Sequence, residues 1–259
     1  MLNETKNYKQ RIIGLSSYRK RNDLVKDLYK DKKCYVISCG PTLMKLDFDK
    51  IREKLKDEMV VCIKQSYDQF KDICDIHIYN CANFKNYDYT GSDTIVVEST
   101  SFGRLLNPKC HLKYHILERR FDKSVSVTKE FSKWQLDNVY ERPYGPGIMY
   151  ETVFYVLQHL GVSEIITLGW DNSLKGTSRR NVHFYDILGG DRTNYVEEND
   201  QKTAVSWESL TKEEKITVDV MGEWYNWLKS QGIELKIISD TNPAPDYVPR
   251  IDYDFINGE

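Results

Sequence analysis

Short apolar runs recur along the chain and alternate with polar or helix-like segments. The clearest runs are 34–37, 59–63, 76–79, 94–97, 112–116, 164–168 and 234–238. Runs of this length are typical of strands that are buried on both faces of a sheet, and the segments 47–55, 147–160 and 215–230 between them have a helical period. The alternation predicts an α/β fold, a mostly parallel Rossmann-like sheet with helices on both faces.

The composition restricts the class of protein. Of the 259 residues, 40% are hydrophobic and 12% aromatic, a balance typical of a globular chain and not of a disordered one. The longest apolar runs are far shorter than the roughly 18 residues that cross a membrane, and the N-terminus lacks the apolar stretch of a signal peptide. We therefore expect a cytoplasmic protein.

The charge is nearly balanced over the whole chain but not at its start. The 37 Lys and Arg residues against 39 Asp and Glu give a net charge of −2, which argues against nucleic acid as a partner. Residues 1–33 hold ten basic and four acidic side chains. We interpret them as a helical extension with a solvated basic face, and peripheral contact with an anionic membrane is the alternative.

We predict one principal domain over 34–240, followed by a tail, 241–259, whose three prolines favour an extended conformation. The polar stretch 172–212 inside the domain is too long for a passive connection, so we predict a lid loop there. The six cysteines show no CxxC spacing and lie in or beside apolar runs, which indicates reduced core residues.

The junction after the first strand is the most informative position for function. Gly40 permits a tight turn, Pro41 can begin a helix and Thr42 can cap it. Free N–H groups at such a helix start attract anions. Because the chain has neither GxGxxG nor GxxxxGK[ST], a nucleotide would be held differently from the usual dinucleotide and P-loop sites.

Residues 28–43 resemble the "GxGPSL" opening shared by bacterial CMP-sialic-acid-dependent sialyltransferases and the motility-accessory-factor group of flagellin glycosyltransferases. The segments 60–65, 78–80 and 147–171 resemble further pieces of that family in the same order. The resemblance implies a GT-A-like variant of the fold. It also implies that a sialic-acid-like sugar is transferred from a CMP-linked donor to a hydroxyl of a glycan or other acceptor.

The resemblance also implies which residues bind the nucleotide-sugar donor. The corresponding positions are Cys39, Gly40, Pro41, Thr42, Lys64, Gln65, Asn80, Pro146, Gly147 and Gly169. The turn 40–42 would cradle the phosphate, the residues after the second and third strands would contact ribose and phosphate, and 146–147 would face the base. Asp171 would line the sugar pocket. The chain departs from the family pattern at Ser38, Cys39, Lys64 and Ser173.

Transfer to a hydroxyl needs a base, and His183 is the candidate. It is the one histidine of five that lies in the long polar stretch, where family members place a catalytic histidine. A neutral imidazole, with an unperturbed pKa of about 6.5, can accept the proton of an acceptor hydroxyl. A partly buried loop residue without a catalytic role is the alternative.

Ser173 stands where the family has a tyrosine that helps the phosphate to depart. In this chain the help would come from Lys175, Arg179, Arg180 or Tyr185.

The sequence predicts no metal site and no cofactor besides the donor substrate. The DxD spellings at 47–49 and 252–254 lie at a helix start and in the tail, where we interpret them as structural. A missing metal motif agrees with a monophosphate leaving group. Two other functions stay open: a Mg/ATP-dependent diphosphokinase of the pterin type, and a nucleotide-binding module without turnover.

Overall fold

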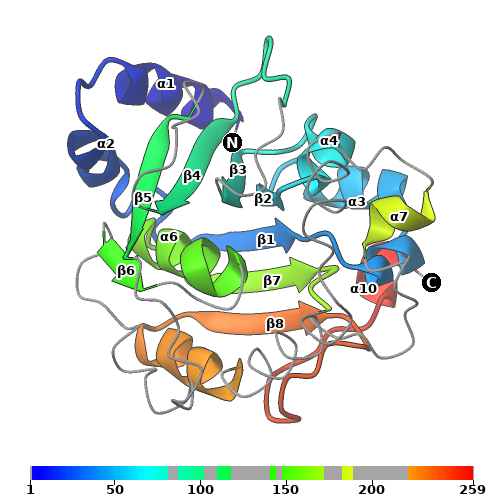
Figure 1. The fold of residues 1–259 in the computed structure, drawn as a ribbon. Coiled ribbons are helices and arrows are strands. Elements are labelled where there is room, and N and C mark those ends of the chain that lie inside the picture. Colours follow the sequence, from blue (N-terminus) through cyan, green and yellow to red (C-terminus); the bar gives the residue numbers. More distant parts are fainter. Residues whose placement is uncertain are drawn as a thin grey trace, which may run out of the picture.

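The computed structural model describes residues 2–80, 87–101, 110–117, 141–143, 148–171, 183–188 and 221–258. Its strands are β1 (Lys33–Ile37), β2 (Met59–Ile63), β3 (Ile76–Asn80), β4 (Ile95–Ser101), β5 (Leu112–Leu117), β6 (Glu141–Pro143), β7 (Glu164–Leu168) and β8 (Glu234–Ile238). They form one sheet in the order β6-β5-β4-β3-β2-β1-β7-β8, and every neighbouring pair is parallel (Figure 1). The predicted α/β class is confirmed.

The central strands are buried because they are built from apolar and β-branched residues. All five positions of β2 are buried, as are the last four of β1 and of β7. A strand of this kind has no polar face to offer to water, so helices must cover both sides of the sheet.

The helical elements are α1 (Leu2–Ile13), α2 (Tyr18–Val25), η1 (Pro41–Lys45), α3 (Phe48–Leu55), α4 (Ser66–Phe70), η3 (Met149–Val153), α6 (Phe154–His159), α7 (Phe184–Ile187), a helix over 221–230 and α10 (Asp254–Asn257). Tyr155 of α6 packs edge-on against Trp224 of the helix 221–230, and Figure 1 shows α6 in front of the sheet. Phe48 of α3 packs on Phe70 of α4. Right-handed connections place this second pair on the opposite face.

The order of the strands reverses at β1. From β1 the chain adds β2 to β6 on one side, and β7 and β8 then lie on the other. In open α/β sheets, ligands bind outside the carboxyl ends of the strands at such a reversal. The carboxyl ends of β1 and β7 therefore mark where a site is to be sought.

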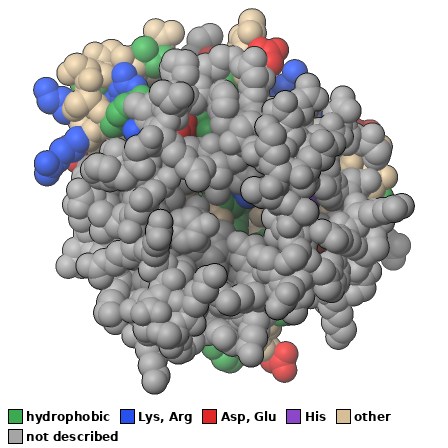
Figure 2. Space-filling model, viewed as in Figure 1, with side chains coloured by type: hydrophobic (Ala, Val, Ile, Leu, Met, Phe, Trp, Pro, Cys, Tyr) green, Lys and Arg blue, Asp and Glu red, His purple; other side chains and the backbone are tan. Residues whose placement is uncertain are grey.

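The N-terminal segment is helical, as predicted, and is also joined to the domain. The Asn22 side chain donates to the Lys113 carbonyl at 2.9 Å, and the His159 ring lies 2.8 Å from the Asn22 carbonyl. Lys and Arg side chains gather on the α1–α2 corner in Figure 2, where Arg19 and Lys20 are exposed. Contact of this corner with an anionic membrane stays a prediction.

The C-terminal segment corrects the prediction of an extended tail. Arg250 forms a parallel bridge with Ile237 of β8, and α10 packs on α3. Phe255 stacks on Tyr35 of β1 with ring centroids 6.4 Å apart. The prolines lie before α10, and the apolar residues after them supply the packing, so the fold continues past 240.

Five cysteines lie in the described residues, and all are buried free thiols: Cys34, Cys39, Cys62, Cys74 and Cys110. The prediction of reduced core cysteines is confirmed for these five.

Candidate functional site

The loops after β1 and β7 run side by side at the reversal of the sheet. The Ser38 N–H donates to the Leu168 carbonyl at 2.8 Å, and the Gly40 N–H donates to the Gly169 carbonyl at 2.7 Å. A Cβ at position 40 would overlap the Gly169 carbonyl oxygen and the Asp171 carboxylate, so only glycine fits. Gly169 has φ of +64°, a conformation that also favours glycine.

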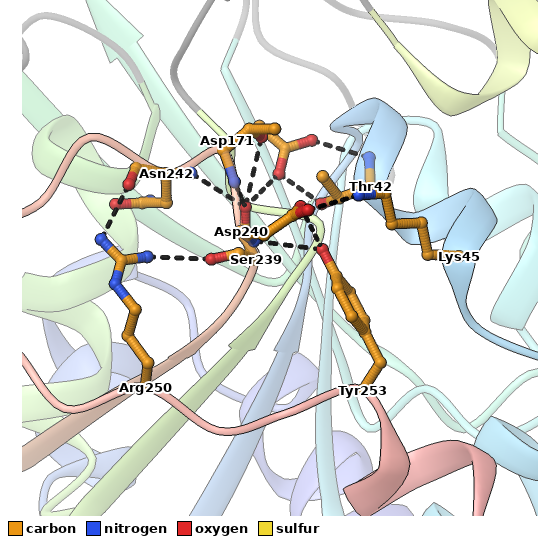
Figure 3. A network of polar contacts seen from close by, with 9 residues as sticks. Thr42, Lys45, Asp171, Ser239, Asp240, Asn242, Arg250 and Tyr253 are labelled. Atoms are coloured by element: carbon orange, nitrogen blue, oxygen red, sulfur yellow. Dashed lines mark hydrogen bonds and ion pairs between the residues drawn. The ribbon is translucent and has the colours of Figure 1, made fainter.

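Asp171 occupies the turn that was expected to hold a phosphate. Its carboxylate accepts a hydrogen bond from the Thr42 N–H at 2.9 Å and another from the Thr42 hydroxyl. The Ser239 hydroxyl, after β8, donates to the same carboxylate at 2.6 Å (Figure 3). Asp171 is 3% exposed. Its carboxylate therefore joins the ends of β1 and β8, and a place for Asp171 in a sugar pocket stays a prediction.

The remaining amides of the turn are engaged as well. The Gly40 N–H is bonded to Gly169, proline has none, and the Leu43 N–H donates to the Gly40 carbonyl at 3.2 Å. In this structure the chain's own carboxylate therefore occupies the turn, and the binding of a phosphate by Gly40, Pro41 and Thr42 stays a prediction.

The C-terminal segment is also hydrogen-bonded to the loops after β7 and β8. The Arg250 guanidinium donates to the carbonyls of Ser239 at 2.8 Å, Asn242 at 2.8 Å and Ala244 at 3.0 Å. The Asn242 side chain donates to the Trp170 carbonyl at 2.5 Å, which connects the segment to the loop after β7. Arg250 is thereby a structural clamp on the loop after β8.

Asp240 forms a second, more exposed contact between the tail and η1. It pairs with Lys45 at 2.5 Å and accepts a hydrogen bond from the Tyr253 hydroxyl at 2.7 Å (Figure 3). Although partial burial raises the pKa of Asp240, the hydrogen bonds from Lys45 and Tyr253 outweigh it and hold that pKa below its ordinary value. The Lys45–Asp240 ion pair and the hydrogen bond from Tyr253 to Asp240 therefore connect η1, the loop after β8 and the C-terminal segment.

The carboxyl ends of β2 and β3 bring together other predicted residues. Ile63 lies opposite Ile78 in the sheet, so Lys64 and Asn80 follow at the same edge. The Lys64 ammonium makes no hydrogen bond or ion pair within the described ranges, and its side chain is half-buried. Gln65, the next residue, is buried. Lys64 is therefore a cation at this edge with no protein partner in the part of the chain that is described.

The Cys39 side chain, predicted to contact the nucleotide, is buried and hydrogen-bonded within the protein. Its thiol donates to the Ile63 carbonyl at 3.1 Å, and burial raises its pKa to about 11. A thiol with such a pKa stays protonated near pH 7 and is neither a nucleophile nor a free contact for a ligand.

The backbone of Cys39 anchors the segment that contains the candidate base, His183. The Phe184 N–H donates to the Cys39 carbonyl at 2.9 Å, and the Phe184 ring packs edge-on against Phe48. His183 and Tyr185 flank Phe184, and their rings stack with centroids 4.8 Å apart. The structure thus brings His183 and Tyr185, predicted from a distant loop, to the carboxyl end of β1.

Some predicted residues lie outside the described residues: Pro146, Gly147, Ser173, Lys175, Arg179 and Arg180. The same holds for the predicted lid 172–212 except for 183–188.

The first DxD spelling is structural, as predicted. The Asp47 side chain accepts from the N–H groups of Asp49 at 2.9 Å and Lys50 at 3.2 Å, which caps α3. No cluster of three or more His, Cys, Asp or Glu residues suited to a metal occurs in the described part of the chain.

Sequence reasoning missed Ser239, Asp240, Tyr253 and His77. The first two directly follow β8, so the rule that parallel strands end at one edge could have found them once β8 was placed beside β7. Nothing local marks Tyr253, because its contacts depend on how the tail packs.

No described helix combines the length and apolar character needed to cross a membrane. Comparison with protein-family models finds no match for this chain, and comparison with curated proteins finds none either.

Proposed function

We propose that the chain is a metal-independent glycosyltransferase that moves a sialic-acid-like sugar from a CMP-linked donor to a hydroxyl acceptor. The observation that carries the proposal is the hydrogen bond from Phe184 to Cys39, which brings His183 to the carboxyl end of β1. That end lies at the reversal of the strand order, where open parallel sheets bind ligands.

The phosphate contact in this proposal belongs to Lys64. Because Asp171 holds the Thr42 amide, the proposal assigns the donor phosphate to Lys64, a cation at the end of β2 without a partner among the described residues. An ammonium beside a departing phosphate stabilises the charge that develops on it. The nucleotide then spans the ends of β1, β2 and β3, with Gln65 and Asn80 beside Lys64.

His183 acts as the general base. Its imidazole takes the proton of the acceptor hydroxyl while the oxygen attacks the anomeric carbon, and the bond from that carbon to the CMP phosphate breaks. The proton passes from the imidazole to water before the next turnover. The ring of Tyr185, stacked on His183, restricts the plane of the imidazole.

A nucleotide-binding module without turnover is the second candidate. The bond between Asp171 and Thr42 favours it, because a buried carboxylate occupies the turn in which the family resemblance puts the donor phosphate. In that case a nucleotide binds at the sheet edge, but the donor bond is not broken.

A nucleotide screen tests the proposal. Thermal shifts are measured with CMP, CDP, UDP, GDP and ATP, each with EDTA and with Mg²⁺, and CMP release is then measured from a CMP-linked sugar. We expect stabilisation by cytidine nucleotides in EDTA, and release of CMP. Stabilisation by ATP with Mg²⁺ alone replaces the proposal with the diphosphokinase. Stabilisation by CMP without release replaces it with the module.

A further inference from the structure

The backbone of Lys64 adopts a conformation that lysine rarely takes. Its φ is +51°, in the left-handed region. The other non-glycine residues with positive φ in the described ranges are Asp27 and Asp31, and short polar side chains tolerate this region better than lysine does. A glycine would make the same turn without strain, so the lysine at this position calls for an explanation from its side chain.

Three hydrogen bonds hold this turn. The Lys64 N–H donates to the Ile78 carbonyl at 3.0 Å, and the Lys64 carbonyl accepts from the Tyr67 N–H at 3.2 Å. The third partner is the Nε2 atom of His77, 2.8 Å from the Lys64 carbonyl oxygen. A carbonyl only accepts, so Nε2 carries the proton. The Nδ1 atom of His77 then accepts from the Tyr89 hydroxyl at 2.6 Å.

The surroundings of His77 keep this arrangement fixed. The ring is fully buried in β3, stacked on Tyr67 at 4.5 Å and packed edge-on against Tyr87 at 4.6 Å. Burial lowers the pKa of His77 to about 3, so the imidazole stays neutral at physiological pH. The His77 ring is therefore a constant donor to the Lys64 carbonyl and takes no part in proton transfer.

The side chain that this turn carries is the Lys64 ammonium at the candidate site. The Lys64 ammonium has no partner in the described residues and acts electrostatically on the Cys39 thiol at the neighbouring strand end. A strained backbone held by a buried hydrogen bond, with a cation that the described residues leave without a partner, is the arrangement expected where strain serves a binding role.

We propose that His77 is a positioning residue: by holding the Lys64 carbonyl it fixes the left-handed turn and directs the Lys64 ammonium to the donor's phosphate. This role rests on the proposed nucleotide site. His77 itself touches no ligand, so its effect is specific to ligands that carry a phosphate.

The binding test uses CMP and cytidine as probes for folded variants. His77→Phe keeps the ring packing and removes the donor, whereas Tyr89→Phe removes only the bond on the other side of the imidazole. We expect His77→Phe and Lys64→Ala each to weaken CMP binding about tenfold, with cytidine binding unchanged. The double variant binds CMP as Lys64→Ala does. Tyr89→Phe and Lys71→Ala, a change at an exposed lysine, leave CMP binding within about twofold.

A conservative pair serves if His77→Phe does not fold. The amide of a glutamine at position 77 reaches the Lys64 carbonyl, and that of an asparagine is too short. We expect His77→Gln to keep CMP affinity and His77→Asn to lose it. Equal CMP affinity of the two variants overturns the role.

A stability cycle tests the turn without any ligand. Glycine adopts the left-handed conformation freely, so we expect His77→Phe to destabilise the Lys64→Gly protein less than the wild type in urea unfolding. Additive effects overturn the role of His77 in holding the turn. If the wild type binds CMP and His77→Phe binds it equally well, the positioning role alone is overturned. Absence of CMP binding by the wild type overturns the proposed function together with this role.

Discussion

The Asp171 carboxylate accepts hydrogen bonds from both the N–H and the hydroxyl of Thr42, a residue 129 positions earlier in the chain. The two residues follow β7 and β1, the strands that meet where the order of the sheet reverses. The contact places the chain's own negative charge in the turn after β1. The proposed donor phosphate is therefore assigned to the Lys64 ammonium.

Asp171→Asn should destabilise the protein. The amide keeps one acceptor but turns its NH₂ group toward a donor, so one of the buried bonds to Thr42 or Ser239 is lost, at a cost of about 1–3 kcal/mol. Urea unfolding measures the change. Asp246→Asn, at an exposed aspartate, is the control and should stay within about 0.5 kcal/mol of the wild type. Equal effects of the two substitutions would contradict the bracing role of Asp171.

Thr42→Val separates stability from ligand binding. The substitution removes the hydroxyl that donates to Asp171 but leaves the backbone N–H in place. We expect a loss of about 1–2 kcal/mol in unfolding free energy. Calorimetric titration should show CMP affinity within about twofold of the wild type, because the proposal assigns the phosphate contact to Lys64. A large loss of CMP affinity without a loss of stability would indicate that the phosphate binds at the turn 40–42 and not at Lys64.

Gly40→Ala should be among the most damaging single changes in the site. The added Cβ overlaps a backbone oxygen of Gly169, which cannot move aside as a flexible side chain can. Overpacking of this kind typically costs about 1–3 kcal/mol, and a forced shift of the backbone places it at the upper end. Gly14→Ala, where the Cβ meets neighbours only at 3.5 Å and beyond, is the matched control. A melting temperature lowered equally in both variants argues against the close approach.

The strands were predictable because each is a short apolar run bounded by polar or small residues. The three residues of β6, Glu141–Pro143, have no such run and were missed, as was α4 with five residues. The prolines of the tail favour an extended conformation, whereas the packing of Phe255 and Ile256 on the domain depends on tertiary contacts that no local pattern indicates. Local signals therefore predicted the elements and not their long-range packing.

The site was predictable in part for the same reason. The turn at Gly40 and the loop histidine at 183 were both identified from the residues, and the structure brings them together. The partner of Thr42 could not be identified, since the bond to Asp171 requires β7 to lie beside β1. Only the strand order supplies that neighbour. The hydrogen bond from His77 to Lys64 likewise depends on a left-handed backbone that no local pattern indicates.

The buried His77 predicts a pH dependence of stability. Its pKa is lowered to about 3 by burial, so below the ordinary value of 6.5 the unfolded chain binds a proton that the folded chain does not. Stability from this group is complete above pH 6.5 and falls as the pH drops toward 3.

In His77→Phe the unfolded chain no longer binds this extra proton. Between about pH 5.5 and 4, the slope of unfolding free energy against pH should be shallower in the variant by about 1.4 kcal/mol per pH unit. His111, whose pKa burial lowers to about 4, contributes in the same direction to both proteins. Urea unfolding at several pH values measures the slopes. Identical slopes would mean that His77 is protonated in the folded protein.

The most direct test of the account measures CMP affinity and sugar transfer together in His183→Ala. The histidine is held beside Cys39 at the end of β1 and is assigned the proton of the acceptor hydroxyl. The account predicts that CMP affinity stays within about twofold and that kcat for transfer falls about 100-fold or more. A variant that transfers the sugar at the wild-type rate would contradict it.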